Sequence, residues 1–362
     1  MTKEITPQPG ILDIAPYKGG ESAVPGVAKI HKLSSNENPL GPSKKAIAAF
    51  KAEAETLHRY PSDSHQELRE AIGRVHDLDP ARVIIGDGSD EVISWLCHAF
   101  AGVGDEVLYT EHGFAMYPIS ALTASATPVV APEKDRRIDV GALLAAVTER
   151  TRVVFIANPG NPTATFVPEE ELARLADALP GNVLLVLDGA YAEYVPGYDG
   201  GRALIDARQN VVMTRTFSKI YGLGGLRVGW CYGPQEIIDI LNRMRGPFNV
   251  ASPGLAAAKA AVEDHDWLQH CLSENATSGA YLTSELTKLG IKVDPSYTNF
   301  ILARFEDAEA ANAAEAALRS AGVLVRKVAG YGLPQALRIT IGDAEACALL
   351  VETLKSHLKG SI

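Results

Sequence analysis

The chain of 362 residues has a formal net charge of −10, with 46% hydrophobic and 22% charged residues. These proportions are ordinary for a soluble globular protein, and the negative charge argues against nucleic acid or an anionic membrane as the main partner. No run approaches the roughly 20 apolar residues that span a bilayer, and the N-terminus lacks the apolar stretch of a signal peptide. The four cysteines are scattered without metal-ligand spacing. We therefore expect a cytoplasmic protein with reduced thiols and no metal.

The length exceeds that of one compact domain, and changes in the sequence pattern predict three parts. Residues 1–42 are rich in Pro and Gly without a sustained period, which predicts an extended N-terminal arm. Residues 43–250 alternate between apolar runs and helical patterns and predict a large domain. Residues 251–362 begin with a long Ala-rich helical region and predict a smaller α+β domain.

Helical patterns open the predicted large domain. Residues 44–57 predict a helix with apolar positions at Ile47 and Phe50. Ser64 and Glu67 form a capping box, after which one apolar face predicts a second helix. This face consists of Leu68, Ala71, Ile72 and Val75.

Short aliphatic runs then alternate with helical patterns such as Pro168–Leu179. The runs are Val83–Ile85, Val107–Tyr109, Val153–Ala157, Val183–Leu187, Val211–Thr214 and Leu226–Cys231. Continuous apolar strands between helices predict an α/β fold with a mostly parallel sheet covered on both faces. In the smaller domain, the expected strands are Asn299–Arg304, Val323–Val328 and Leu337–Ile341.

Three of the predicted strands run into unusual polar residues. Asn161 follows the third run, Asp188 and Tyr191 follow the fourth, and Lys219 follows the fifth. In open α/β sheets ligands bind at the carboxyl ends of strands. A lysine amine there can form a Schiff base with an aldehyde cofactor, and pyridoxal 5′-phosphate (PLP) also needs a carboxylate beside its pyridine nitrogen. The pattern therefore predicts PLP on Lys219, with Asp188 at the nitrogen and Asn161 and Tyr191 at the ring oxygen.

The cofactor phosphate requires hydroxyls, backbone amides and a cation. Thr216, Ser218 and Arg227 lie close to Lys219 in the sequence, and the turn Gly86–Glu91 precedes a helix whose N-terminus can bind an anion. Each residue alone has a simpler explanation, since a single lysine is usually a surface residue and Asn-Pro is a turn signal. Only their order and their placement at strand ends favour the cofactor.

The same residues resemble fold-type I aminotransferases over essentially the whole chain. The resemblance rests on Asn161-Pro162-Thr163, Asp188-x-x-Tyr191, Ser218-Lys219 and Arg227. Further segments are similar to the histidinol-phosphate aminotransferase family: Ile14-Ala15-Pro16-Tyr17, Ser35-Asn36-Glu37-Asn38-Pro39-Leu40-Gly41, Arg59-Tyr60-Pro61 and Gly88-Ser89-Asp90-Glu91. The implied fold is the fold-type I PLP-dependent transferase, a seven-stranded type of sheet in the large domain plus a smaller α+β domain.

The resemblance also implies individual roles. Lys219 forms the internal aldimine and moves the proton between the substrate and the cofactor, with Asp188 and Tyr191 as its catalytic partners. The residues implied at the cofactor phosphate are Ser89, Asp90, Thr216, Ser218 and Arg227; Phe114 stacks on the ring; and the residues implied at the substrate are Tyr17, Asn161, Arg326 and Arg338. Tyr60 would reach the phosphate of the neighbouring subunit's cofactor, which makes a homodimer the expected functional unit.

Three positions depart from the family pattern. Ala164 replaces the glycine that usually ends Asn-Pro-Thr-Gly, and we expect a small effect because a side chain is costly there only at positive φ. Gly19 stands where the arm usually has proline, and Phe114 lies in an unusual local sequence.

The resemblance implies ping-pong amino transfer between L-histidinol phosphate and 2-oxoglutarate. Alternatives stay open. An aromatic amino-acid aminotransferase would share the architecture, because hydrophobic pockets separate similar side chains by only about 1–3 kcal/mol. A phosphothreonine-type PLP decarboxylase has a similar scaffold. A PLP-sensing regulator would need a DNA-binding module, for which the chain has no basic patch.

Overall fold

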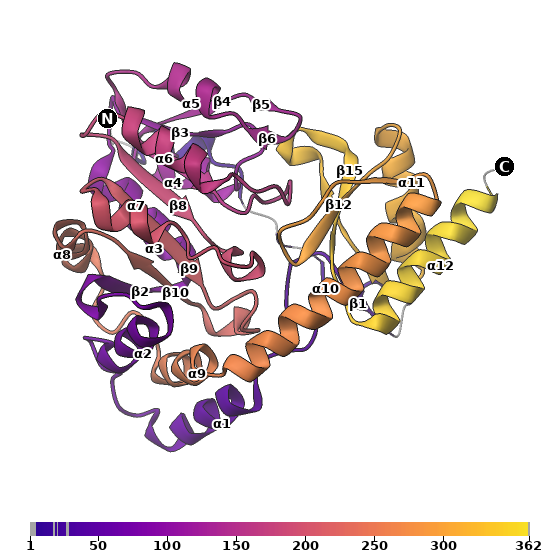
Figure 1. Ribbon diagram of the computed structural model, residues 1–362, viewed down its shortest axis with the longest axis horizontal. Coiled ribbons are helices and arrows are strands. Elements are labelled where there is room, and N and C mark those ends of the chain that lie inside the picture. The colour runs from indigo at the N-terminus through magenta and orange to yellow at the C-terminus, as the bar shows by residue number, and fades with distance from the viewer. Residues whose placement is uncertain (1–4, 17–18, 20, 27–28, 361–362) are drawn as a thin grey trace.

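A seven-stranded sheet and a four-stranded sheet lie side by side in the computed structural model, which describes residues 5–16, 19, 21–26 and 29–360 (Figure 1). The large sheet has the order β2-β10-β9-β8-β7-β3-β4. Its strands are β2 (Val83–Asp87), β3 (Glu106–Thr110), β4 (Thr127–Ala131), β7 (Thr151–Ala157), β8 (Leu184–Asp188), β9 (Val211–Thr216) and β10 (Val228–Tyr232). Only β10 runs antiparallel to its neighbours, so the predicted α/β fold with a mostly parallel sheet is confirmed.

All the strands predicted for the large sheet are present, and the sequence pattern missed β4. This strand pairs with β3 alone, at the edge of the sheet. Most of its residues keep some contact with solvent, and Pro128 interrupts the aliphatic pattern. An edge position therefore explains why no continuous apolar run marks it.

Helices cover both faces of the large sheet because its strand residues alternate between two apolar clusters. On β8, Leu185 and Leu187 contact one cluster, whereas Leu184 and Val186 contact the other. The first cluster packs on α2 (Gln66–His76), α5 (Val140–Ala146), α6 (Glu169–Ala178), α7 (Arg202–Ala207) and α9 (Ser252–Val262). The second packs on α3 (Gly88–Phe100), α4 (Met116–Thr123) and α8 (Gln235–Met244).

The small sheet is antiparallel with the order β11-β12-β15-β14. Its strands are β11 (Lys292–Val293), β12 (Phe300–Arg304), β14 (Arg326–Val328) and β15 (Leu333–Thr340), and its helices are α10 (His265–Lys288), α11 (Ala308–Ser320) and α12 (Ala344–Gly360). Helix α10 runs from the large sheet to the small one (Figure 1). The single strand predicted over residues 323–328 is divided into β13 (Val323–Leu324) and β14.

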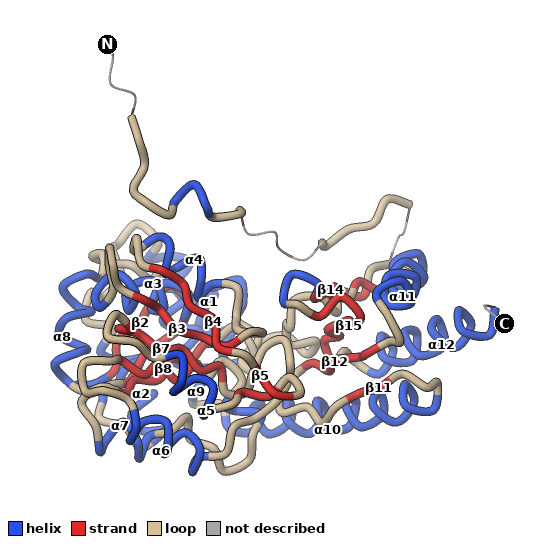
Figure 2. The backbone as a smooth tube through the Cα atoms, turned by 90° about the horizontal axis from the view of Figure 1, so that it is seen from above, coloured by secondary structure: helices blue, strands red, loops and turns tan. Residues whose placement is uncertain are grey.

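The N-terminal segment reaches both parts of the molecule. Figure 2 shows its described residues along the outside, above the large sheet and then above the small one. Gly10 lies against Leu122 of α4, Glu21 forms an ion pair with Arg319 of α11, and β1 (His31–Lys32) pairs with β13. The boundaries of the predicted arm, large domain and small domain stay predictions.

The helix predicted over residues 44–57 is present as α1 (Lys44–Ala52) and a following 3-10 turn (Glu53–Thr56), with Ala46 buried and Ile47 and Phe50 39% and 42% exposed. One detail of the predicted helices is wrong. Helix α2 begins after His65 without a side-chain cap, because the Ser64 hydroxyl contacts Ser62 instead. The remaining short elements are the 3-10 turns Ile11–Asp13, Pro80–Arg82, Ala192–Tyr194, Gly224–Leu226 and Ala329–Tyr331, and the hairpin of β5 (Glu133–Lys134) and β6 (Arg137–Ile138). Across the described ranges, no helix is both long and apolar enough to cross a membrane.

His65 makes the stability of this fold depend on pH. Its side chain is buried, and burial together with Arg245 and Arg69 lowers its pKa to about 4, while Asp63 opposes them. The unfolded chain takes up this proton below about pH 6.5, whereas the folded chain does not until about pH 4. Stability contributed by His65 is thus present above pH 6.5 and lost as the pH falls, by about 1.4 kcal/mol per pH unit.

We predict that His65→Asn, which tolerates the positive φ of 50° at this position, weakens this pH dependence. The free energy of unfolding should fall by about 2 kcal/mol less between pH 7 and pH 5 than in the wild type. Urea unfolding at both pH values measures the difference. Equal losses in the two proteins would show that His65 titrates normally.

Candidate active site

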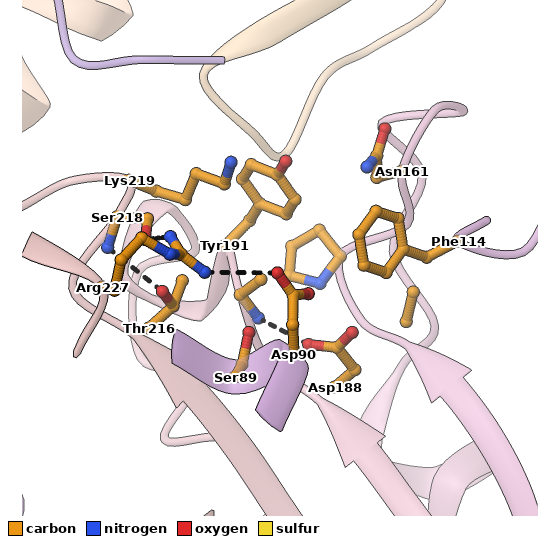
Figure 3. A pocket seen from close by; sticks show the side chains of 13 residues that line it. Ser89, Asp90, Phe114, Asn161, Asp188, Tyr191, Thr216, Ser218, Lys219 and Arg227 are labelled. Carbon is orange, nitrogen blue, oxygen red and sulfur yellow. Dashed lines mark hydrogen bonds and ion pairs between the residues drawn. The ribbon is translucent and has the colours of Figure 1, made fainter. Parts of the chain in front are cut away.

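A cavity of about 110 Å³ lies at the carboxyl ends of β7, β8 and β9, facing the N-terminus of α3 (Figure 3). Its lining consists of Ser89, Asp90, Phe114, Ala157, Pro159, Asn161, Asp188, Ala190, Tyr191, Thr216, Ser218, Lys219 and Arg227. The structure therefore brings together every residue predicted at the cofactor except Tyr60. Lys219 and Arg227 enter from one side, and Phe114 and Asn161 from the other (Figure 3).

Strand register explains why residues distant in sequence meet here. Ala157 at the end of β7 pairs with Asp188 at the end of β8, which in turn pairs with Thr214 of β9. The loop after β7 is held by the buried Asn158, whose side chain exchanges two hydrogen bonds with the backbone of Val167, at 2.8 and 3.0 Å. That loop carries Asn161 to the rim of the cavity.

Asp188 places a carboxylate at the floor of the cavity. It accepts hydrogen bonds from the Tyr117 hydroxyl at 2.7 Å, the Thr214 hydroxyl at 3.2 Å and the Ala190 amide at 3.3 Å. Burial raises the pKa of Asp188, the nearby Asp90 adds to this, and the three donors oppose it. The carboxylate is thus desolvated but well supplied with donors, and it suits a cationic N–H partner in the cavity.

Tyr117 is a site residue that the sequence interpretation missed. Its ring is buried and stacks on Phe155 at 4.6 Å, and it meets the edge of Phe114 at 5.8 Å. Burial and the neighbouring Asp188 raise the pKa of its hydroxyl well above the usual value, so it stays a donor. Because α4 starts just after Phe114, Tyr117 follows it by one helical turn, and no motif marked it.

The opposite pole of the cavity is built for an anion. The first turn of α3 begins at Gly88, with φ of 80°, and Ser89 and Asp90 of this turn line the cavity. The first backbone amides of a helix have no partner within the helix and suit an anion. The Arg227 guanidinium lies beside this turn, 3.3 Å from Asp90 Oδ2 and 3.4 Å from the Ser218 hydroxyl. A side chain at Gly88 would overlap Arg227, because a Cβ there would lie 2.3 Å from the guanidinium.

Lys219 and Tyr191 lie between the two poles. The Lys219 Nζ is 5.7 Å from the centre of the Tyr191 ring, which packs edge-on against Phe300. Behind them, Arg215 of β9 points to the other face of the sheet and pairs with the buried Glu193 at 2.9 Å. This ion pair fastens the segment after β8, which carries Tyr191, to the strand that precedes Lys219.

Arg338 of β15 brings the small sheet to the rim of the cavity. Its side chain is buried, donates to Asn161 Oδ1 at 2.7 Å and to the Ser34 carbonyl at 2.8 Å, and lies 5.5 Å from the Phe300 ring. Arg326 of β14 lies opposite Arg338 of β15 in the strand register, but it does not line the cavity. The predicted substrate residue Tyr17 lies outside the described residues.

Tyr60 is also apart from the cavity. Its side chain is 82% exposed and stacks on Phe248 with ring centres 4.7 Å apart. An exposed aromatic pair is available to another chain, as the expected homodimer requires, but the predicted contact with a neighbouring cofactor stays a prediction.

The backbone at Ala164 adopts the positive φ at which we expected a side chain to be costly, so the effect of this substitution is larger than predicted. Its φ is 60°, in the left-handed region, where a side chain costs roughly 1–2 kcal/mol. The methyl group is buried in a cluster with Tyr191 and Phe300, which returns about 0.8 kcal/mol. The strain we had discounted is therefore present, and packing offsets part of it.

Comparison with known proteins defines the family. The model for aminotransferase class I and II matches residues 28–354. Histidinol-phosphate aminotransferases from Ruegeria pomeroyi and Dinoroseobacter shibae are 60% and 61% identical to this chain, over 98% and 97% of both proteins. The crystal structure of histidinol-phosphate aminotransferase from Sinorhizobium meliloti in complex with pyridoxal-5'-phosphate has a TM-score of 0.88, 29% identity and 92% coverage of each chain.

The chain is therefore a PLP-dependent transaminase of the class I and II aminotransferase family. Within that family it belongs to the histidinol-phosphate aminotransferases, as its sequence segments indicated.

We predict that Tyr117→Phe raises the pKa of Asp188, because the hydroxyl bond that favours the charged carboxylate is lost. The free energy of unfolding should also fall by about 1–3 kcal/mol, since a buried acceptor loses a donor. Carboxyl carbon NMR of the cofactor-free protein and urea unfolding measure the two effects. Tyr109→Phe is the matched control, because Tyr109 packs 6.2 Å from Tyr117 and is not a partner of Asp188. The same Asp188 titration in both variants would contradict the assignment.

Proposed function

We propose that this aminotransferase transfers an amino group between L-histidinol phosphate and 2-oxoglutarate, with PLP carried covalently on Lys219. The observation that carries the proposal is the pair of cationic poles. Arg227 and the α3 N-terminus form one, and the buried Arg338 beside Asn161 forms the other. One suits the cofactor phosphate, and the other remains for an anionic group of the substrate.

The donor set fits PLP at its pyridine nitrogen, its ring oxygen and its phosphate. Asp188 offers a buried carboxylate to the pyridine N–H, and Tyr191 and Asn161 offer groups for the ring oxygen. Thr216, Ser218 and the amides of Ser89 and Asp90 supply donors for the phosphate. When bound, PLP supplies an electron sink for the charge left at the substrate Cα after its proton is removed.

Lys219 is the group that moves protons. With PLP bound, Lys219 would hold the cofactor through Nζ, and the same amine, when released, would take the proton from the substrate Cα and pass it on. Asp188 would hold the pyridine nitrogen of PLP, because an anionic partner in a buried site favours the protonated, cationic ring. The same residues act in both halves of the reaction, which predicts ping-pong kinetics.

Arg338 is suited to both substrates. A guanidinium binds carboxylate and phosphate alike through a planar pair of donors. Asn161 Oδ1 and the Ser34 carbonyl each hold one of its terminal nitrogens, so the group is oriented in advance. Arg326 on the adjacent strand adds positive charge, and we propose that it and Tyr17 assist at the same end of the substrate.

We further propose a cytoplasmic homodimer as the working form, divided into an arm (1–42), a large domain (43–250) and a small domain (251–362). In this arrangement Tyr60 reaches the cofactor phosphate of the neighbouring subunit. The exposed stack of Tyr60 on Phe248 supports an intersubunit role, because aromatic side chains are enriched at interfaces.

The proposal predicts a clear substrate preference. With 2-oxoglutarate as acceptor, kcat/KM for histidinol phosphate should exceed that for phenylalanine and tyrosine at least a hundredfold, or about 2.7 kcal/mol. Steady-state kinetics of the PLP-loaded enzyme measure the ratio. Parity, or a preference for the aromatic amino acids, would assign the enzyme to aromatic transamination, and release of carbon dioxide without oxo-acid turnover would make it a decarboxylase.

A further inference from the structure

Asn36 is a buried residue in the segment Ser35–Gly41, to which neither the sequence pattern nor the proposed function assigns a role. It is 1% exposed and has a φ of 57°. The left-handed region is uncommon for a residue other than glycine, although asparagine tolerates it. Its segment lies where β12, β15 and the cavity meet, so a strained and buried polar residue stands close to the reaction site.

Hydrogen bonds occupy each polar group of Asn36. Its amide N–H donates to the Thr340 hydroxyl at 2.9 Å, and its carbonyl accepts from Asn299 Nδ2 at 2.9 Å. Its side-chain oxygen accepts from the Thr340 hydroxyl at 3.2 Å, and its side-chain nitrogen donates to the Tyr191 hydroxyl at 2.8 Å. Such a residue has one orientation.

The direction of these bonds follows from Thr340. Its hydroxyl oxygen accepts the backbone N–H of Asn36, so its own hydrogen is free to point to the Asn36 side-chain oxygen. That leaves the Asn36 NH₂ group facing Tyr191. A phenol oxygen that accepts from Asn36 must send its single hydrogen elsewhere, and Tyr191 lines the cavity. The hydroxyl of Tyr191 is therefore left to donate its hydrogen to a group in the cavity.

We propose that Asn36 is a positioning residue that directs the Tyr191 proton into the cavity and connects Tyr191 to strand β15, which carries the substrate-binding Arg338. This inference rests on the proposed function of the cavity. It assigns Asn36 a task distinct from closing a turn, which glycine at the same φ would do equally well.

The connection to Arg338 runs along one short strip of backbone. The Ser34 carbonyl accepts a hydrogen bond from Arg338, and the Leu33 carbonyl accepts one from the Thr340 amide at 2.9 Å. Asn36 bonds to the Thr340 hydroxyl through both its backbone N–H and its side-chain oxygen. Residues 33–36 thus lie along β15 between the two functional groups.

The effect is measurable without turnover. A donor to the ring oxygen stabilises its negative charge most after the nitrogen joining Lys219 to the cofactor has lost its proton, so it lowers the pKa of that nitrogen. Loss of the directed Tyr191 donor should raise it. Among the described residues, the other titratable or charged groups at the cavity are Lys219, Asp188, Asp90 and Arg227, with Tyr117, Tyr194 and Arg338 beside it, and the variants below leave all of them in place.

The test is a pH titration of the absorbance of the PLP-loaded, substrate-free enzyme. Asn36→Gly keeps the left-handed backbone, introduces no charge and removes only the side chain. It should raise the midpoint pH of this titration by at least half a pH unit, which is a threefold or greater rise in the proton affinity of the nitrogen joining Lys219 to the cofactor. It should also weaken PLP binding. A wild-type midpoint in Asn36→Gly would overturn the proposal and leave Asn36 as a turn residue.

Thr340→Val and Thr340→Ser form a matched pair that decides the matter even if Asn36→Gly does not fold. Valine removes the hydroxyl that orients Asn36, and serine retains it. The midpoint should shift upward in Thr340→Val only; equal midpoints in the pair would overturn the proposal. A wild-type enzyme without the absorbance of a lysine-linked cofactor would instead remove the proposed function itself.

Discussion

The burial of one carboxylate, that of Asp188, is the constraint on which the arrangement of the site depends. A charge removed from water is costly unless donors surround it, and three surround Asp188, from α4, from β9 and from the segment that follows β8. The side of the carboxylate that these donors do not cover faces the cavity. Because β8 is the middle strand of the large sheet, the donors come from elements packed on it, and the position of the carboxylate is determined by the core.

Two further parts of the site lie around this carboxylate, the anion pole at α3 and the substrate pole at Arg338. The anion pole at α3 and Arg227 is built from backbone geometry, since it depends on the absence of a side chain at Gly88. The substrate pole belongs to a different sheet and reaches the cavity through Arg338 and the strip of residues 33–36. The two poles therefore belong to different sheets: one is part of the large-sheet core, and the other is carried by β15.

Much of this could be predicted from the sequence, because the central strands are continuous apolar runs and the cofactor residues follow directly after them. Lys219, Asp188 and Tyr191 needed only that placement to be found. Residues whose role arises from packing between distant segments could not be predicted in this way. Tyr117 contacts Asp188 across 71 positions of sequence, and Asn36 contacts Tyr191 across 155. The predicted cap at Ser64 failed for the same reason, since the local pattern does not reveal that its hydroxyl bonds to Ser62 in the folded chain.

The central claim is that Lys219 carries the cofactor, and reduction of the PLP-loaded protein with borohydride followed by peptide mass spectrometry tests it most directly. The account predicts one pyridoxyl group per chain, on the peptide that contains Lys219, and none in Lys219→Ala. Labelling of a different lysine, or an unchanged label in Lys219→Ala, would contradict it.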